Sequence, residues 1–287
     1  MLDQNRWQPW EYQYYLIILF LLLYRNNQKQ FFNYFIFLLA IIYINSGLHK
    51  ISGGFLFEVW ESMILKSFFG FSTTQIQSLW IHYSGLSLGI IEVLSGIGLL
   101  FYKSQKQAAI TLIVMHIFIL LLISPTGLNY NSIVWPWNIA MILFLYVIFI
   151  KNNDNQIVFL NLLKGYNKVI FFLIGVAPIF NFFGYWDDYL SFNLYSGNSK
   201  RLEICFPKNS NIPEYQKFLS KKSRFCKSCA VLKGNDWALK EMNVVLYPEN
   251  RLFIGIIKKW KQKNPQINTT FYSYKYPYRT KDIKIYQ

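Results

Sequence analysis

Long apolar runs constrain the fold of this chain more than any other feature. Five of them lie in the first 184 residues, at 31–47, 79–102, 107–124, 133–150 and 168–184. A helix of about 20 apolar residues crosses the hydrocarbon core of a bilayer, and each run approaches that length. Only 15% of the residues are charged, whereas soluble domains average about 25%. The sequence therefore predicts an integral membrane protein.

A sixth apolar run at 10–24 is shorter, with LIILFLLL at its centre. Such a segment either spans the bilayer at a tilt or lies partly in the interface. The polar stretch RNNQKQ follows it without a small-residue cleavage site, so we expect the segment to be retained. The predicted fold is an all-α polytopic bundle of five or six transmembrane helices over 31–184, preceded by a short span or interfacial helix in 1–30.

Basic residues in the short loops predict the orientation. With six spans, three of them (Arg6, Lys50 and Lys66) fall on one side of the membrane. The other side receives Arg25, Lys29, Lys103, Lys106, Lys151, Lys164 and Lys168. Cytoplasmic loops carry the excess of Lys and Arg, so the larger set predicts the cytoplasmic side. We therefore expect a bacterial inner-membrane protein with residues 185–287 in the periplasm.

Residues 185–287 differ from the bundle in composition, with 19 basic and 8 acidic residues. Strand-like runs at 190–198 and 202–206 and helical patterns at 235–244 and 247–263 predict a small α+β domain. The last helix places Trp260 on an apolar face, away from Lys258, Lys259 and Lys261. Such a basic amphipathic helix is suited to anionic lipid headgroups. No zinc-finger spacing or RNP-like motif points to nucleic acid.

Between the second and third runs, residues 55–69 (FLFEVWESMILKSFF) alternate polar and apolar positions at helical spacing. This pattern predicts an amphipathic helix that lies in the membrane interface or folds back over the bundle. It is either a connector or a lid over a cavity.

Two ionisable residues fall inside apolar runs, Glu92 in GLSLGIIEVLSGIGLL and His116 in TLIVMHIFILLL. Charged groups in a bilayer are costly, which suggests a function for them. Neighbouring spans are antiparallel, so the two side chains are expected to meet at mid-depth. The pair would relay protons or bind a polar ligand head, or it is a buried hydrogen bond that fixes helix packing. Glycines around Glu92 provide close helix approach or room for a flat ligand.

The stretch YINSGLHKISGG ends the second run and places Asn45, His49 and Lys50 at the outer rim. Lys50 either snorkels to the headgroups or, if the 55–69 helix covers it, acts as a base. Asn138, next to an aromatic pair that suits a membrane belt, and Trp60 are candidates for the same ligand pocket.

These residues carry a family resemblance. Ser46-Gly47-Leu48-His49-Lys50-Ile51 and the glutamate of IEVLSGIGLL at 91–100 resemble DoxX and HTTM-type four-helix membrane domains, which include the membrane part of vitamin K-dependent gamma-carboxylase. Trp60 and His116 also suit the HTTM pattern. Over residues 31–150, the resemblance implies a four-helix unit that handles a lipophilic or redox-linked partner, with Lys50 at the position of the carboxylase's basic lysine. The chain lacks the large C-terminal region of the carboxylase, so carboxylation of protein glutamates is not implied.

The three cysteines all lie in the basic region, as Cys205 and the C-x-x-C of Cys226 and Cys229. In a periplasmic domain the pair is a structural disulfide with Cys205 left as a free thiol, or it exchanges thiols with a partner. Lys221, Lys222, Arg224 and Lys227 nearby favour the thiolate. Zinc lacks a fourth ligand, because all three histidines lie in the membrane part.

Two functions follow from these features. In the first, a redox-associated membrane protein holds a quinone-like or lipid ligand, with Glu92 and His116 handling protons and Lys50 as a base. In the second, a non-catalytic accessory or scaffold subunit of an envelope complex uses the bundle as an anchor and the basic region to dock a protein partner. No P-loop, dinucleotide fingerprint, G-x-S-x-G or H-E-x-x-H motif is present.

Overall fold

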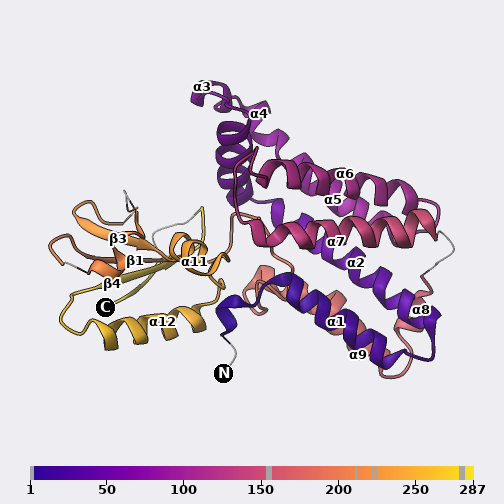
Figure 1. The fold of residues 1–287 in the computed structure, drawn as a ribbon. Coiled ribbons are helices and arrows are strands. Elements are labelled where there is room, and N and C mark those ends of the chain that lie inside the picture. Colours follow the sequence, from indigo (N-terminus) through magenta and orange to yellow (C-terminus); the bar gives the residue numbers. More distant parts are fainter. Residues whose placement is uncertain (1–2, 153–156, 211, 221–222, 224, 278–281) are drawn as a thin grey trace. The chain divides into compact units, whose positions relative to one another are not determined.

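The protein is described from a computed structural model that covers residues 3–152, 157–210, 212–220, 223, 225–277 and 282–287. It is 62% helical and divides into two compact units. A helical unit comprises Pro9–Gly197, and a C-terminal unit combines Asn198–Gln287 with the first eight residues. Residues 185–197, which the sequence groups with the basic region, thus belong to the helical unit. Figure 1 shows both units as ribbons.

The helical unit is built from one long helix, three other long apolar helices and several shorter elements. Its main α-helices are α1 (Pro9–Leu23), α2 (Gln28–Lys50), α4 (Leu79–Ser84), α5 (Leu86–Gly98), α6 (Gln105–Ile123) and α7 (Trp135–Tyr146). Shorter pieces are α3 (Thr73–Ile76), α8 (Phe159–Leu162) and α9 (Asn167–Phe171). The 3₁₀ and π segments are η2 (Phe55–Phe68), η3 (Ser132–Val134), η4 (Val147–Lys151), η5 (Phe172–Val176) and η6 (Ala177–Phe183).

Four helical stretches are long and apolar enough to cross a membrane: Gln28–Lys50, Leu79–Gly98, Gln105–Ile123 and Ser132–Lys151. They coincide with four of the five predicted runs, which makes the chain an integral membrane protein. Within the described residues, the predicted count of five or six spans is not confirmed. Helix α1 has 15 residues, and Asn167–Phe183 is a shorter apolar stretch that passes from α to π to 3₁₀ helix.

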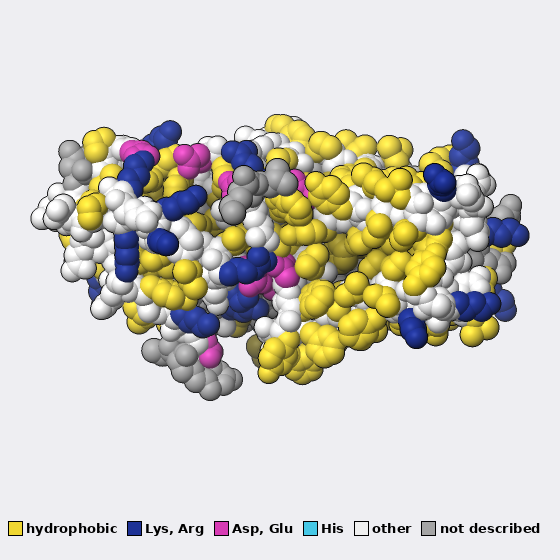
Figure 2. All heavy atoms as spheres, turned by 90° about the horizontal axis from the view of Figure 1, so that it is seen from below, with side chains coloured by type: hydrophobic (Ala, Val, Ile, Leu, Met, Phe, Trp, Pro, Cys, Tyr) yellow, Lys and Arg dark blue, Asp and Glu magenta, His cyan; other side chains and the backbone are white. Residues whose placement is uncertain are grey.

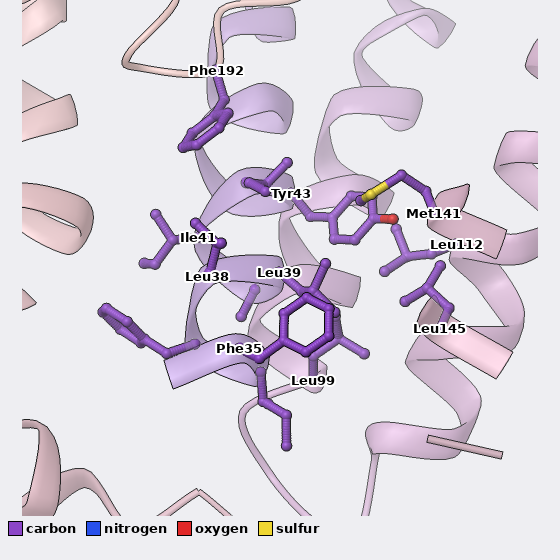
Figure 3. Close-up of a cluster of buried hydrophobic side chains, with 14 of the residues drawn as sticks. Phe35, Leu38, Leu39, Ile41, Tyr43, Leu99, Leu112, Met141, Leu145 and Phe192 are labelled. Atoms are coloured by element: carbon purple, nitrogen blue, oxygen red, sulfur yellow. The ribbon is translucent and has the colours of Figure 1, made fainter. Parts of the chain in front are cut away.

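Helix α2 is the centre of the helical unit. In its apolar stretch 78% of the residues are buried, against 28% to 33% in the other three long helices. Its side chains pack on residues from α5, α6 and α7, among them Leu99, Leu112, Met141 and Leu145 (Figure 3). Such an all-round apolar helix has no polar face to present to water and is stable only when surrounded.

Glycines bring α2 and α5 unusually close together. A Cβ atom built on Gly47 would lie 2.7 Å from the carbonyl oxygen of Gly89, and one on Gly89 would lie 2.9 Å from that of Gly47. At Gly96 a Cβ would lie 2.9 Å from the backbone nitrogen of Ile44. Small residues allow helix backbones to touch in a membrane. The glycines near Glu92 therefore provide close helix packing, the first of the two uses expected from the sequence.

The outer surface of the helical unit is apolar. Exposed hydrophobic residues occur on α1, α5, α6, α7 and the 167–183 stretch, for example Leu22, Leu94, Val114, Leu143 and Phe172. Figure 2 shows one face of the unit, on which hydrophobic side chains form a broad surface and dark-blue Lys and Arg side chains lie at the right-hand end. The seven basic residues predicted for the cytoplasmic side are all exposed.

The C-terminal unit is an antiparallel sheet with helices. Its five strands have the order β2-β3-β1-β4-β5, with β1 (Arg201–Pro207) at the centre. The others are β2 (Leu219–Ser220), β3 (Cys229–Lys233), β4 (Thr270–Tyr274) and β5 (Lys284–Tyr286). The helices are α10 (Pro213–Gln216), α11 (Gly234–Met242) and α12 (Asn250–Lys263), and a short 3₁₀ turn η1 (Gln4–Arg6) belongs to the same unit.

The central strand has two different faces. Leu202, Ile204 and Phe206 alternate toward a core that includes Ala238 of α11 and Phe253 of α12. Glu203 and Cys205 occupy the other face, since successive residues of a strand point to opposite sides. The predicted strand at 202–206 and both predicted helices are thus present. The predicted strand at 190–198 is wrong, because that segment forms turns in which Phe192 and Tyr195 have positive φ angles.

Candidate functional site

The helical unit contains a buried ion pair. The Nζ of Lys50, at the end of α2, lies 2.5 Å from the Oε2 of Glu92 in α5, and it also donates to the Oγ of Ser46 at 2.7 Å. The side chains are 13% and 4% exposed, respectively. The close approach of the helices at Gly47 and Gly89 lets a lysine on one reach a glutamate on the other. Lys50 therefore does not simply extend to the headgroups, because a carboxylate holds its ammonium group.

A second set of buried polar side chains links α2 to α6 and α7. The Nε2 of His116 lies 2.8 Å from the hydroxyl of Tyr43, and its Nδ1 lies 2.7 Å from the Oδ1 of Asn138. The Nδ2 of Asn138 donates to the carbonyl oxygen of Val134 at 2.8 Å. All three side chains are buried. If Nδ1 carries the proton, the imidazole donates to Asn138 and accepts from Tyr43, so a neutral histidine satisfies both ring nitrogens.

The expected direct pairing of Glu92 with His116 is wrong. Within the described chain Glu92 bonds to Lys50, whereas His116 bonds to Tyr43 and Asn138. The physical reason lies in the neighbours on α2, since a lysine and a tyrosine offer each group a complementary partner. Tyr43, Ser46 and Lys50 follow one another at helical spacing on α2, so both polar contacts lie along one side of that helix.

The other rim residues pack within the unit. The His49 ring stacks on Phe182, with centroids 4.4 Å apart, and is buried. The Nδ2 of Asn45 bonds to the carbonyl oxygen of Ile41 at 3.0 Å, while its Oδ1 has no hydrogen-bond partner in the described part of the chain. Asn45 thus retains an acceptor that is buried and available.

The amphipathic helix predicted at 55–69 is present as the π-helix η2, which contacts α2, α3 and α4. The indole of Trp60 donates to the carbonyl oxygen of Ile81 at 2.7 Å and packs on Gly85. Beside it, Glu61 lies 2.5 Å from the Nδ1 of His82. These contacts give Trp60 and Glu61 a packing function in a connector, and none of them involves Lys50.

The three cysteines lie together in the C-terminal unit. Cys226 and Cys229 form a disulfide, with Cα atoms 5.9 Å apart, and Cys205 is a free, buried thiol. Burial raises the pKa of Cys205 to about 11. Of the four basic residues expected around the pair, Lys227 is exposed, and Lys221, Lys222 and Arg224 lie outside the described residues.

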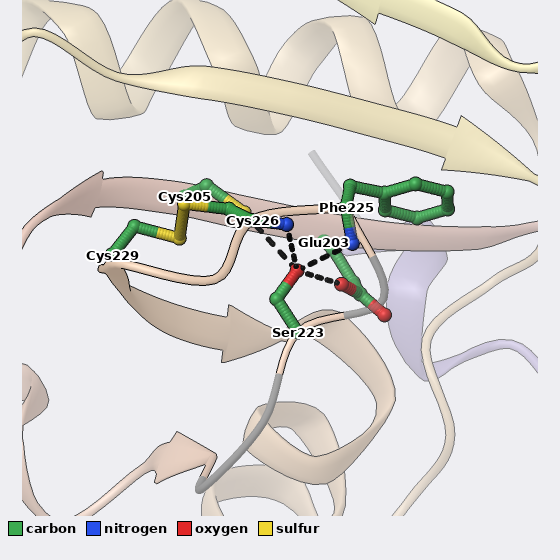
Figure 4. The surroundings of a disulfide bond; sticks show 6 residues. All are labelled: Glu203, Cys205, Ser223, Phe225, Cys226 and Cys229. Atoms are coloured by element: carbon green, nitrogen blue, oxygen red, sulfur yellow. Dashed lines mark hydrogen bonds between the residues drawn. A yellow bond between two sulfur atoms is a disulfide. The ribbon is translucent and has the colours of Figure 1, made fainter.

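A buried carboxylate lies beside the disulfide. Glu203 accepts hydrogen bonds from the hydroxyl of Ser223 at 3.1 Å and of Tyr274 at 2.7 Å. The Oγ of Ser223 in turn accepts from the backbone N–H groups of Phe225 and Cys226 (Figure 4). Neither Glu203 nor Ser223 was predicted as a site residue from the sequence. The alternation in LEICF could have indicated Glu203, because it places an acidic residue and a cysteine on one face.

The predicted membrane-binding helix is α12, but Trp260 does not take part in such binding. Trp260 is buried against Tyr215 and Phe206, and its indole donates to Thr269 at 3.1 Å. The apolar face of α12 covers the sheet, which explains its amphipathic pattern. The basic residues predicted with it (Lys258, Lys259 and Lys261) remain exposed, and their affinity for lipid stays a prediction.

The described residues contain no group of three or more His, Cys, Asp or Glu side chains arranged to hold a metal ion. Comparisons with protein-family models, with curated proteins and with solved structures found no match. The resemblance to DoxX and HTTM-type domains therefore stays a prediction.

Proposed function

We propose that the helical unit is a redox-associated membrane module that holds the polar head of a quinone-like or lipid ligand. The observation that carries the proposal is the buried polar set of Tyr43, Lys50, Glu92, His116 and Asn138, contributed by four apolar helices. Ionisable groups within a membrane are costly and usually mark a pathway or a ligand site. Lys50 and Glu92 together offer one donor and one acceptor of opposite charge to an oxygen-bearing head group.

The proposal includes the location of the protein. We infer a bacterial inner membrane with the C-terminal unit on the periplasmic side. The exposed basic residues of the loops support this orientation, because they gather at one end of the helical unit. In it, α1 and the 167–183 stretch also cross the membrane, which agrees with the hydrophobic residues on their outer faces.

A matched double variant tests the ligand proposal. Replacing one partner of the ion pair would leave a largely buried charge without a counter-charge and destabilise the fold, whether or not a ligand binds there. Lys50→Met with Glu92→Gln removes both charges and nearly preserves volume. After purification in mild detergent, native mass spectrometry with lipid extraction should find a stoichiometric quinone or lipid on the natural protein. An equal yield of folded double variant should lack it.

The proposal fails if the natural protein carries no such molecule or if the double variant retains it. A second function, a non-catalytic subunit of an envelope complex, is supported by the way the buried groups satisfy one another. Both nitrogens of His116 have partners, and Lys50 is neutralised by Glu92. That function predicts a stable complex with other envelope proteins in the same preparation, no small ligand, and an unchanged complex for the double variant.

A further inference from the structure

The C-terminal unit carries a second site on the sheet face opposite α11 and α12. We propose that the Cys226–Cys229 disulfide is an exchange site that takes two electrons from a dithiol on a protein segment whose acidic residues contact the exposed Lys227 between the two cysteines. Glu203 and Ser223 are positioning residues that hold the loop bearing Cys226. This proposal does not depend on the function of the helical unit, because its residues all lie in the other compact unit.

The disulfide is poorly suited to a purely structural purpose. It joins residues three positions apart, so the ring it closes is among the smallest possible. The stabilisation that a cross-link provides grows with the length of the closed loop, and here it is small. Both cysteines are half-buried, and the residues between them, Lys227 and Ser228, are exposed. An incoming sulfur atom therefore has access to the bond.

Hydrogen bonds hold the loop independently of the sulfur–sulfur bond. The Oγ of Ser223 accepts from the N–H of Phe225 at 2.9 Å and of Cys226 at 3.1 Å, and it donates to Glu203. The Phe225 ring stacks on Tyr272, with centroids 4.8 Å apart. None of these contacts uses the sulfur atoms of Cys226 or Cys229, so they do not depend on the disulfide being closed. The site is thus organised to keep the two sulfur atoms near each other in the reduced state.

Glu203 anchors the loop that bears Cys226, although burying its carboxylate costs free energy of folding. It is 1% exposed, and its hydrogen-bond partners in the described residues are two hydroxyl groups, without a cation. Burying a carboxylate without an ion-pair partner costs free energy of folding, which hydrogen bonds offset only in part. An apolar residue at this position would suit the sheet better. Its hydrogen bond to Ser223 gives it a use, because Ser223 sets the position of Cys226.

Atoms and electrons balance between the Cys226–Cys229 disulfide and the substrate dithiol. A substrate thiolate attacks the Sγ of Cys226, which lies in the loop, and the bond to Cys229 breaks. Cys229 leaves as a thiolate and takes a proton from water, and the exposed ammonium group of Lys227 favours this charge. The second substrate thiol gives its proton to water and displaces Cys226, which is protonated in turn. The substrate becomes a disulfide, and Cys226 and Cys229 become thiols.

Cys205 does not take part in the thiol–disulfide exchange. The register pairs Cys205 with Val231, so Cys205 lies diagonally across from Cys229 on the same face of the sheet. Its thiol is buried, and it stays protonated at neutral pH because burial raises its pKa to about 11. Thiolates, not thiols, attack disulfides. The Sγ of Cys205 lies 3.7 Å from the Oγ of Ser223. Cys205→Ser is therefore the matched control, because it removes the third sulfur atom and keeps a small hydrogen-bonding side chain beside Ser223.

The test uses the full chain in mild detergent with two synthetic peptides that carry the same dithiol flanked by acidic or by basic residues. After quenching with a maleimide, peptide mass mapping follows the reduction of the disulfide. We expect the rate of the acidic peptide with the folded chain to be within tenfold of its rate with the unfolded chain. With the folded chain, the acidic peptide should also react at least fivefold faster than the basic peptide. Cys205→Ser should change the rate less than twofold. Glu203→Gln and Ser223→Ala should each shift the equilibrium constant at least tenfold, about 30 mV.

Two outcomes overturn the proposal. The first is a disulfide that the acidic peptide reduces more than tenfold more slowly in the folded chain than in the unfolded chain. Equal rates of the acidic and the basic peptide with the folded chain have the same consequence. The second is a loss of more than about 5 °C in Tm when Cys226 and Cys229 are both replaced by serine, which would assign the bond to structure. Equilibrium constants that are unchanged in folded Glu203→Gln and Ser223→Ala would remove these two residues from the site.

Discussion

Lys50 of α2 and Glu92 of α5 meet at 2.5 Å beside the point where Gly47 and Gly89 bring the two helix backbones into contact. The first prediction follows from this ion pair. Glu92→Leu alone should destabilise the helical unit by about 3–5 kcal/mol, because it leaves the largely buried Lys50 ammonium group with Ser46 but without a counter-charge. The double variant Lys50→Met, Glu92→Leu should recover most of that loss. Denaturant unfolding in detergent, followed by circular dichroism, measures both.

If the single variant were as stable as the natural protein, the two charges would not be coupled in the folded state. The matched control is Lys66→Met, which removes an exposed lysine of η2 and should change the stability by less than about 0.5 kcal/mol.

Gly89→Ala should separate α2 from α5. The added methyl group would lie 2.9 Å from the backbone oxygen of Gly47, and a backbone atom yields less readily than a flexible side chain. We expect a loss of about 1–3 kcal/mol. The same substitution at Gly255, where a Cβ meets no atom within 4 Å, should raise the stability of α12 by up to about 1 kcal/mol. Thermal unfolding of the two variants compares them directly, and similar losses would contradict the close approach.

Tyr43→Phe removes the hydroxyl group that contacts the Nε2 of His116 and keeps the ring. It should cost about 1–3 kcal/mol, because a buried ring nitrogen loses its partner. Tyr146→Phe is the control, since this tyrosine is exposed on α7. The resonance frequencies of a ¹⁵N-labelled histidine ring should shift in the first variant and not in the second. An unshifted His116 would show that the hydroxyl does not bond to it.

Cys205 should resist alkylation by iodoacetamide at pH 8 and react as the pH approaches its raised pKa of about 11. The raised pKa also affects stability. A thiol that ionises at about 9.0 when unfolded and about 11 when folded favours the folded state below pH 9, and this contribution falls as the pH rises toward 11. Cys205→Ser should lose less stability between pH 8 and pH 10.5 than the natural protein. Equal losses would contradict the shift.

Trp260→Ala should destabilise the C-terminal unit by about 3–5 kcal/mol, because it opens a cavity between α12 and the sheet. Replacing Lys258, Lys259 and Lys261 by glutamate should leave the stability of the fold nearly unchanged and weaken binding to anionic vesicles at least tenfold. Vesicle sedimentation and thermal unfolding measure the two effects. Unaltered vesicle binding in the triple variant would exclude this surface as the lipid contact.

The sequence could predict the elements whose environment makes the same demand of any protein, as a bilayer does. Four apolar runs became long apolar helices, because the bilayer demands length and hydrophobicity from any span. The run at 168–184 met the composition requirement, yet its helix passes through π and 3₁₀ turns around Gly175 and Pro178. Local composition gives no measure of such interruptions.

Partners of the polar residues could not be predicted from composition. Glu92 and His116 were correctly identified as buried, but antiparallel neighbours at similar depth are not sufficient to pair them. Lys50 and Tyr43 bond to them instead, and this depends on the rotation of α2 about its axis. The same limit applies to α12, whose apolar face suits a membrane and a sheet equally well. Only the presence of the sheet decides between the two surfaces.

Residues of strand β1 alternate between the hydrophobic core on one face of the sheet and the face that carries the cysteines on the other. If it paired with its neighbours one residue out of register, Leu202, Ile204 and Phe206 would face the cysteine loop, and Glu203 would enter the core. A charged residue in a core of aromatic and aliphatic side chains would prevent that misfolded form from persisting. Glu203 thus also acts against incorrect strand pairing while the chain folds. Glu203 stabilises the loop that bears Cys226 in the folded protein, and during folding it would ensure that this loop forms on the correct face of the sheet.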